Sequence, residues 1–192
     1  MTTFNSTDDH EPEAIPADLA ARCATIELLA VDVDGVLTDG GIIVDDRGVE
    51  SKRFFVRDGL GFTLWHRAGK RSAIVSGRSA EVVDRRAAEL KIHRVAQGIG
   101  DKASALRDLL VEFGLDASQA CYIGDDLIDL PALGLAGLAA CPADAVAEVR
   151  RAAHLTTRSI GGNGVVRDVV EVIMKAQGLW HAACEGYRVP AM

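Results

Sequence analysis

Aromatic residues are scarce in this chain of 192 residues, where two Trp, two Tyr and five Phe make up 5% of the sequence. The core must therefore be built mainly from Val, Ile, Leu and Ala. The chain also lacks an apolar stretch of the roughly 20 residues that a membrane span needs. Residues 1–13 are polar and acidic, without the basic and apolar segments of a signal peptide. These absences predict a cytoplasmic protein with no membrane partner.

Positive charge is also in short supply, because 21 Lys and Arg face 28 Asp and Glu, for a net charge of −7. Such a surface is a poor partner for nucleic acid, so we expect none. It would also repel a phosphorylated ligand, so any phosphate site must supply positive charge locally. The four cysteines are widely spaced and match no zinc pattern, and we interpret them as core or incidental residues rather than disulfide partners.

Apolar runs of strand length alternate with helical patterns through most of the chain. The expected strands are Ile26–Val33, Ser72–Val75, Ile92–Ala96, Ala120–Ile123 and Leu138–Ala140. The expected helices are Ala17–Ala24, Leu60–Ala68, Ala80–Leu90, Ala103–Phe113, Ala143–Ala152 and Gly164–Ala176. This alternation predicts an α/β fold with a central parallel sheet covered by helices on both faces.

One segment breaks the alternation directly after the first strand. Gly41–Val44 and Ser51–Val56 read as two short strands around a turn at residues 45–48, which predicts a β-hairpin flap over residues 39–57. No other insertion is long enough for a second domain. We therefore expect a disordered tail over residues 1–15, a single domain over 16–178 and a C-terminal tail over 179–192.

Acidic residues follow two of the expected strands. Asp32 and Asp34 end the first strand, and Asp125, Asp126 and Asp129 come directly after the strand at Ala120–Ile123. Ligands in parallel α/β folds bind outside the carboxyl ends of the strands, so these side chains would meet if the two strands are neighbours. Oxygen ligands of this kind suit Mg²⁺. One carboxylate could attack phosphorus, and another could transfer protons.

Two further residues can supply what a phosphate needs. Ser76 follows the strand at Ser72–Val75 in the run Ser76-Gly77-Arg78, where a hydroxyl and backbone N–H groups can bind phosphate oxygens. Lys102 precedes the helix at Ala103, and its ammonium can bridge phosphate and nucleophile. Each feature alone is more often a turn, a helix cap or a surface lysine. Their order, each after an apolar strand, favours one catalytic site.

These motifs resemble the haloacid dehalogenase superfamily, in its phosphatase branch. The run Asp32-Val33-Asp34-Gly35-Val36-Leu37-Thr38-Asp39-Gly40 matches its first motif, and the short flap resembles that of its capless group. Further segments are similar to the family of phosphatases that act on 3-deoxy-D-manno-octulosonate 8-phosphate: Val56–Gly59, Ser76–Arg78, Gly124–Pro131 and Gly161–Arg167. The resemblance implies a Rossmann-like three-layer sandwich with no cap domain.

The resemblance also implies roles for individual residues. Asp32 would be the nucleophile and Asp34 the general acid/base, with Ser76 and Lys102 holding the phosphoryl group. Asp32, the backbone carbonyl of Asp34 and Asp125 would bind Mg²⁺. The sugar acid phosphate would be bound by Asp34, Phe55, Val56, Arg57, Asp58, Gly59, Thr63, Arg78, Arg86, Lys102 and Asp126. Arg78 and Arg86 would suit the sugar carboxylate, since a guanidinium can pair with it through two hydrogen bonds.

The family implies hydrolysis of the sugar acid phosphate in lipopolysaccharide synthesis by a homotetramer whose flaps meet at its centre, with C-terminal tails that can reach a neighbour's site. Two alternatives stay open. The substrate could be 2-keto-3-deoxy-nononate 9-phosphate, although the related phosphatases tend to have Glu where this chain has Arg78. The chain could instead be a non-catalytic phospho-aspartate signalling domain, whose acidic motifs come in a different order. The loop Gly161–Gly164 could be a simple turn or an anion-binding loop.

Overall fold

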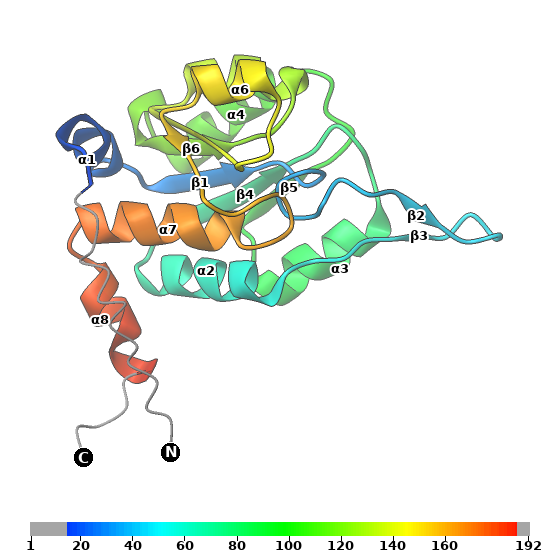
Figure 1. The fold of residues 1–192 in the computed structure, drawn as a ribbon, viewed down its shortest axis with the longest axis horizontal. Helices are drawn as coiled ribbons and strands as arrows, with labels where there is room; N and C mark the ends of the chain where they lie inside the picture. The colour runs from blue at the N-terminus through cyan, green and yellow to red at the C-terminus, as the bar shows by residue number, and fades with distance from the viewer. Residues whose placement is uncertain (1–14, 188–192) are drawn as a thin grey trace, which may run out of the picture.

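The computed structural model describes residues 15–187, which form a three-layer α/β sandwich (Figure 1). The central sheet has six parallel strands in the order β5-β4-β1-β6-β7-β8. Their bounds are β1 Leu28–Val31, β4 Arg71–Val75, β5 Arg94–Ala96, β6 Ala120–Ile123, β7 Leu138–Cys141 and β8 Leu155–Thr156. The predicted fold class is therefore confirmed.

Helices connect the strands and cover the sheet. They are α1 Ala17–Cys23, α2 Val56–Arg67, α3 Glu81–Leu90, α4 Lys102–Phe113, α5 Leu130–Leu135, α6 Ala147–Ala152, α7 Val165–Ala176 and α8 Trp180–Cys184. Three short 3₁₀ helices are η1 Ala117–Gln119, η2 Leu127–Asp129 and η3 Glu185–Tyr187. No helix within residues 15–187 is long and apolar enough to cross a membrane.

Two apolar clusters hold the layers together, one on each face of the sheet. Leu29 and Val31 of β1 pack with α1, α2, α3 and α7, whereas Leu28 and Ala30 pack with α4, α5 and α6. Successive side chains of a strand point to opposite faces, so a strand buried on both faces must be apolar throughout. Figure 1 shows α2 and α7 on one side of the sheet and α4 and α6 on the other.

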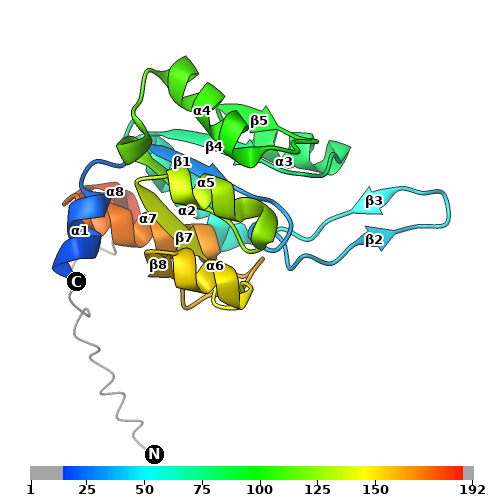
Figure 2. The same ribbon diagram turned by 90° about the horizontal axis from the view of Figure 1, so that it is seen from above.

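The predicted flap is present as an antiparallel hairpin of β2 Ile43–Val44 and β3 Glu50–Ser51, which projects from the body of the molecule (Figure 2). Asp45 closes its turn, because its Oδ1 accepts hydrogen bonds from the backbone N–H of Arg47 and Val49 at 3.0 and 2.8 Å. The expected strand Ser51–Val56 is wrong beyond Ser51, since the chain leaves the hairpin there and begins α2 at Val56.

Several short elements were not expected from the sequence. The helix α5 and the strand β8 are only 6 and 2 residues long, too short for a periodic pattern to be recognised. The helix α8 and η3 lie in the segment that was expected to be a C-terminal tail. Most of the expected N-terminal tail, residues 1–14, lies outside the described residues.

Candidate active site

Asp32 directly follows β1 at the carboxyl edge of the sheet, where β1 and β6 are the two central strands. The backbone N–H of Asp32 donates to Ile123 O at 2.9 Å, which extends the pairing of β1 with β6 to the first acidic residue. Asp125 follows β6 two residues later. A Cβ on Gly35, which has a φ of +86°, would lie 2.0 Å from Asp125 Oδ2. Only glycine lets the two acidic segments approach this closely.

Lys102, the first residue of α4, supplies the positive charge that the site needs. Asp101 caps this helix, because its Oδ1 accepts a hydrogen bond from Ser104 N at 3.0 Å. The Lys102 ammonium is buried, 2.8 Å from Asp32 Oδ2 and 2.7 Å from Asp129 Oδ1. Burial of a charge is costly unless it is paired, and here two carboxylates pair with one ammonium.

Asp129 is fully buried and fixes the geometry of its neighbours. Its Oδ1 also accepts from the Tyr122 hydroxyl at 2.9 Å, while its Oδ2 accepts from the backbone N–H of Asp125 and Asp126 at 3.1 and 3.3 Å. Both of its oxygens are thus occupied by donors. Asp129 therefore positions Lys102 and the loop that carries Asp125.

The excess of carboxylates over cations changes their acidity. Burial, followed by the charge of Asp129, raises the pKa of Asp32 to about 6. Burial, followed by the charges of Asp32 and Asp129, raises the pKa of Asp125 to about 7. Burial alone would lower the pKa of Lys102, but the charges of Asp32 and Asp129 outweigh it and raise that pKa. A site with this surplus of negative charge favours a bound cation.

Three carboxylates offer oxygens that could hold this cation. One oxygen from each of Asp32, Asp125 and Asp129 lies within 4.8 Å of the others. Since Asp129 already accepts four hydrogen bonds, Asp32 and Asp125 are the better ligands. An all-oxygen set at this spacing fits the preference of Mg²⁺.

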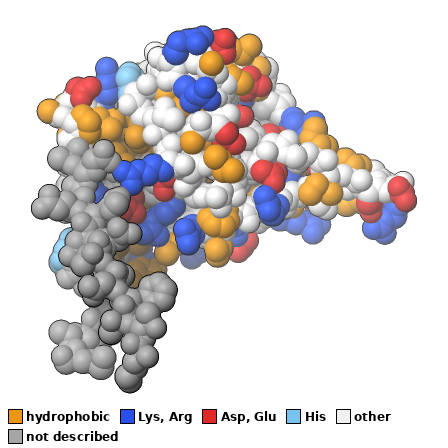
Figure 3. Space-filling model, viewed as in Figure 1, with side chains coloured by type: hydrophobic (Ala, Val, Ile, Leu, Met, Phe, Trp, Pro, Cys, Tyr) orange, Lys and Arg blue, Asp and Glu red, His pale blue; other side chains and the backbone are white. Residues whose placement is uncertain are grey.

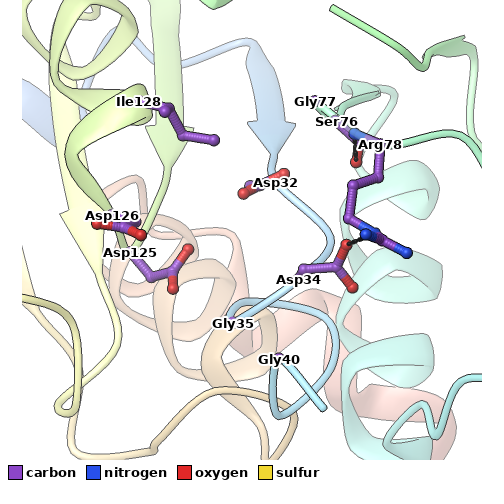
Figure 4. Close-up of a pocket in the computed structure, with 10 residues that line it drawn as sticks. All are labelled: Asp32, Asp34, Gly35, Gly40, Ser76, Gly77, Arg78, Asp125, Asp126 and Ile128. Carbon is purple, nitrogen blue, oxygen red and sulfur yellow. Dashed lines mark hydrogen bonds and ion pairs between the residues drawn. The ribbon is translucent and has the colours of Figure 1, made fainter. Parts of the chain in front are cut away.

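The acidic cluster opens into a pocket of about 230 Å³. Figure 4 shows Asp125 and Asp126 on one side, Ser76 and Arg78 on the other with Asp34 beside Arg78, and Asp32 between the two sides. The complete lining is Asp32, Asp34, Gly35, Gly40, Ser76, Gly77, Arg78, Asp125, Asp126 and Ile128. The structure thus brings together seven of the predicted site residues, counting Lys102 beneath Asp32: Asp32, Asp34, Ser76, Arg78, Lys102, Asp125 and Asp126.

Two residues at the base of the flap contact the pocket and were not predicted. Lys52 Nζ donates to Asp34 Oδ1 at 2.5 Å and lies 2.9 Å from Glu50 Oε1. The other Glu50 oxygen accepts from Arg78 Nη2 at 3.0 Å, and Arg78 Nε lies 3.6 Å from Asp34 Oδ2. Asp34 is thus held by two cations, one from the flap and one from the loop after β4.

The remaining predicted substrate residues lie outside this pocket in the described part of the chain: Phe55, Val56, Arg57, Asp58, Gly59, Thr63 and Arg86. Val56 and Arg57 are exposed at the start of α2, and the Thr63 hydroxyl donates to Gly59 O. Asp58 is buried, and its Oδ1 accepts from Arg167 N at 3.1 Å, so it joins α2 to the start of α7. Burial raises the pKa of Asp58 to about 6.

Arg86 is partly buried beside α2. A Cβ on Gly59 would lie 2.9 Å from Arg86 Nη2, so the guanidinium passes close to the backbone of α2. Arg86 Nη1 also donates to Glu89 Oε2 at 2.8 Å, and Arg86 Cζ lies 5.8 Å from the centroid of the Phe54 ring. These contacts place Arg86 between α2 and α3.

The loop Gly161–Gly164 packs against the catalytic turn, which is the turn at residues 35–39 that follows Asp34. A Cβ on Gly161 would lie 2.3 Å from Gly35 O, and one on Gly162 would lie 2.5 Å from Asp39 N. Gly162 N donates to Val36 O at 3.0 Å. The glycines thus allow close contact between two backbones, which favours the turn interpretation over an anion-binding loop.

The chain is similar to known phosphatases over most of its length. Residues 92–168 match the family of haloacid dehalogenase-like hydrolases. The 3-deoxy-D-manno-octulosonate 8-phosphate phosphatase of Escherichia coli strain K12 is 40% identical over 164 residues, which are 85% of this chain and 87% of that protein.

Solved structures of such phosphatases share the fold. The enzyme of Moraxella catarrhalis, in complex with a magnesium ion, a phosphate ion and a KDO molecule, has a TM-score of 0.86 and 41% identity over 88% of this chain and 97% of its own. The cobalt-bound enzyme of Haemophilus influenzae has a TM-score of 0.81 and 38% identity over 83% and 93% of the two chains. The resemblance inferred from the motifs is confirmed.

Proposed function

The chain belongs to the 3-deoxy-D-manno-octulosonate 8-phosphate phosphatase family of haloacid dehalogenase-like hydrolases, and we propose that it hydrolyses this sugar acid phosphate to the free sugar acid and phosphate. The reaction serves lipopolysaccharide synthesis in the family that the motifs resemble. One observation carries the proposal for this chain. Asp32 and Asp125, which follow two neighbouring strands, line one pocket, and Asp32 pairs with the buried ammonium of Lys102.

Mg²⁺ is the proposed cofactor, held by the Asp32 and Asp125 carboxylates and the backbone carbonyl of Asp34. When bound there, the ion offsets the repulsion between a carboxylate nucleophile and a phosphate dianion. The ammonium of Lys102 lies beside Asp32 and would contact a phosphoryl oxygen of a substrate bound there. Ser76, with the backbone N–H groups of its loop, would bind the phosphoryl oxygens on the opposite side.

The first half of the proposed reaction forms a covalent intermediate. A carboxylate oxygen of Asp32 attacks phosphorus, and the bond between phosphorus and the sugar oxygen breaks. Asp34 gives its proton to that leaving oxygen, which departs as the sugar hydroxyl. The products of this step are the free sugar acid and an aspartyl-phosphate at Asp32.

The second half regenerates the enzyme. The Asp34 carboxylate takes a proton from a water molecule, whose oxygen attacks phosphorus. The bond between phosphorus and Asp32 breaks, phosphate leaves, and Asp34 is again protonated. These two half-reactions need two adjacent carboxylates with separate roles. Asp32 and Asp34 both line the pocket.

Arg78 is the proposed partner of the sugar carboxylate. It lines the pocket and its side chain is 47% exposed, so it can exchange Glu50 for a ligand. An Arg here also favours the eight-carbon acid over the nine-carbon one. The substrate contacts predicted for Asp126 and for the residues at the start of α2 stay proposals. Of these residues, Asp126 lines the pocket and the others do not.

We also propose a single domain over residues 16–178 that assembles as a homotetramer through its flaps. Apolar residues of the flap are more than half exposed: Ile42, Ile43, Val44 and Val49. Figure 3 shows hydrophobic side chains along the projecting hairpin. Exposed apolar residues gathered on one element indicate a protein interface. Light scattering tests this, and a monomer would contradict it.

The activity is tested by phosphate release from a panel of sugar phosphates with Mg²⁺. The panel holds 3-deoxy-D-manno-octulosonate 8-phosphate, its nine-carbon relative and common hexose phosphates. We expect preference for the eight-carbon acid, loss with EDTA, and no turnover by a folded Asp32→Asn variant. Preference for another phosphate would reject the substrate but keep the chemistry, whereas activity in Asp32→Asn would reject the mechanism.

A further inference from the structure

Lys52 is a buried cation at the base of the flap. It follows β3, its side chain is 1% exposed, and its Nζ contacts the Asp34 carboxylate at 2.5 Å and Glu50 Oε1 at 2.9 Å. A lysine loses much rotamer freedom when it is fixed in this way, and a buried ammonium must be paired. A lysine whose only purpose was solubility would extend into water.

The flap presents Lys52 and Glu50 to the pocket together. They are two residues apart in an extended segment, so both side chains point to the same side of it. Glu50 contacts Lys52 with one oxygen and Arg78 with the other, at 2.9 and 3.0 Å. Asp34, Lys52, Glu50 and Arg78 thus form a closed ring of ion pairs between the flap, the catalytic turn and the loop after β4.

The two cations of this ring are not equivalent. Arg78 is 47% exposed and lies 3.6 Å from Asp34 through Nε, so water weakens that pair and the guanidinium is free to contact a ligand. Lys52 is shielded from water and does not line the pocket. Its ion-pair partners are the carboxylates of Asp34 and Glu50, so it acts on the pocket through Asp34.

We propose that Lys52 is a positioning residue of the reaction, which holds the Asp34 carboxylate in the orientation needed for proton transfer to the leaving oxygen. Glu50 in turn orients Lys52. This inference rests on the proposed acid/base role of Asp34. It makes the placement of the flap a condition for that proton transfer, although the flap carries no group that touches phosphorus.

The test compares Lys52→Met with Lys52→Arg on two substrates. The sugar acid phosphate has a poor leaving group that needs a proton, whereas p-nitrophenyl phosphate has a good one that does not. We expect Lys52→Met to lower kcat/KM, which reports the steps up to departure of the leaving group and excludes hydrolysis of the intermediate, about 10- to 100-fold on the first substrate and less than about threefold on the second. Lys52→Arg, which keeps a cation, should recover much of the loss.

Arg53→Gln is the matched control, because Arg53 is the next residue but is exposed and pairs with Asp39. It should leave both activities unchanged. Equal losses of kcat/KM on the two substrates in Lys52→Met would overturn the inference. So would a fully active Lys52→Met. If Lys52→Met does not fold, Lys52→Arg takes its place. A loss of kcat/KM in Lys52→Arg that is equal on the two substrates would overturn the inference.

A double-mutant cycle separates this inference from the proposed function. If Lys52 acts through Asp34, Lys52→Met should cost almost nothing more in an Asp34→Asn background. Independent, additive losses would reject the positioning role while leaving Asp34 as the acid. If Asp34→Asn itself lowers kcat/KM equally on both substrates, the proposed role of Asp34 as the acid fails instead.

Discussion

Gly161 packs against the backbone of Gly35, since a Cβ on Gly161 would lie 2.3 Å from the Gly35 carbonyl oxygen. The loop before α7 therefore supports the turn that follows Asp34 from behind. The two segments are far apart in the sequence, and the contact between them does not itself involve the substrate. The precision of the catalytic turn thus depends on a residue more than a hundred positions away.

Gly161→Ala should therefore lower both stability and activity. The added methyl must push the catalytic turn away, at a cost of about 1–3 kcal/mol in the free energy of unfolding. Displacement of Asp34 by about 1 Å could lower kcat/KM by roughly 100-fold. Urea unfolding and steady-state kinetics measure the two effects.

Gly134→Ala is the control for this variant. Gly134 lies in α5 and a Cβ at this position would have no atom within 4 Å, so Ala should be neutral or stabilise the helix by up to about 1 kcal/mol. A Gly161→Ala enzyme as stable and active as Gly134→Ala would show that the loop does not support the turn.

Asp129→Asn should destabilise the protein. Both oxygens of Asp129 accept hydrogen bonds, so an Asn amide would face the Lys102 ammonium or a backbone N–H with a donor of its own. Loss of one partner of a buried ion pair costs about 3 kcal/mol. Urea unfolding should show this loss, while Asp108→Asn, exposed on α4, should change stability by less than about 0.5 kcal/mol. Similar midpoints for the two variants would contradict the assigned role.

Asp125→Asn should raise the Mg²⁺ concentration needed for activity. This change removes one charged ligand but keeps the shape of the side chain, so the half-saturating Mg²⁺ concentration should rise at least about tenfold. A Mg²⁺ titration of turnover measures it. Asp108→Asn again serves as the control and should leave the titration unchanged. The same metal dependence in Asp125→Asn and the wild type would exclude Asp125 as a ligand.

His66 should make the stability depend on pH. Burial, followed by the charge of His93, lowers the pKa of His66 to about 4, and its Nε2 lies 2.7 Å from the buried Ser72 Oγ. The unfolded chain has a His pKa of about 6.5. Between these values the unfolded state binds more protons, so the His66 contribution to stability is present above pH 6.5 and is lost as the pH falls toward 4.

His66→Gln should therefore lose less stability than the wild type between about pH 7 and about pH 5. The measurement is urea unfolding of both proteins at each pH. His181→Gln, whose imidazole is exposed on α8, should follow the wild type. A steeper or equal loss in His66→Gln would contradict the assignment.

The sequence revealed the catalytic centre because its signals are local. Asp32, Ser76 and Asp125 each follow an apolar strand, and the carboxyl ends of parallel strands lie at one edge of a sheet. Lys102 was singled out by its place in the order of these motifs, and the structure shows that Asp101 caps the helix that it begins. The order of the motifs along the chain was the signal, whereas the adjacency of β1 and β6 that brings them together came from the structure.

The ion pairs of the flap could not be predicted in the same way. Lys52 reaches Asp34, and Glu50 reaches Arg78, because of where the base of the hairpin lies. The residues of a hairpin do not determine how it is placed against the rest of the fold. The one available signal was the spacing of Glu50 and Lys52. They flank Ser51 in an extended segment, so their side chains point to the same side of it. Likewise, nothing in the sequence near Asp58 shows that its carboxylate accepts a hydrogen bond from Arg167 at the start of α7.

The central claim is that Asp32 carries the phosphoryl group, and chemical trapping tests it most directly. The enzyme is mixed with 3-deoxy-D-manno-octulosonate 8-phosphate and Mg²⁺, quenched during turnover and reduced with borohydride, which converts an aspartyl-phosphate to homoserine. Peptide mass spectrometry then locates the product. We predict homoserine at position 32, dependent on both substrate and Mg²⁺; homoserine at another position, or none during active turnover, would contradict the account.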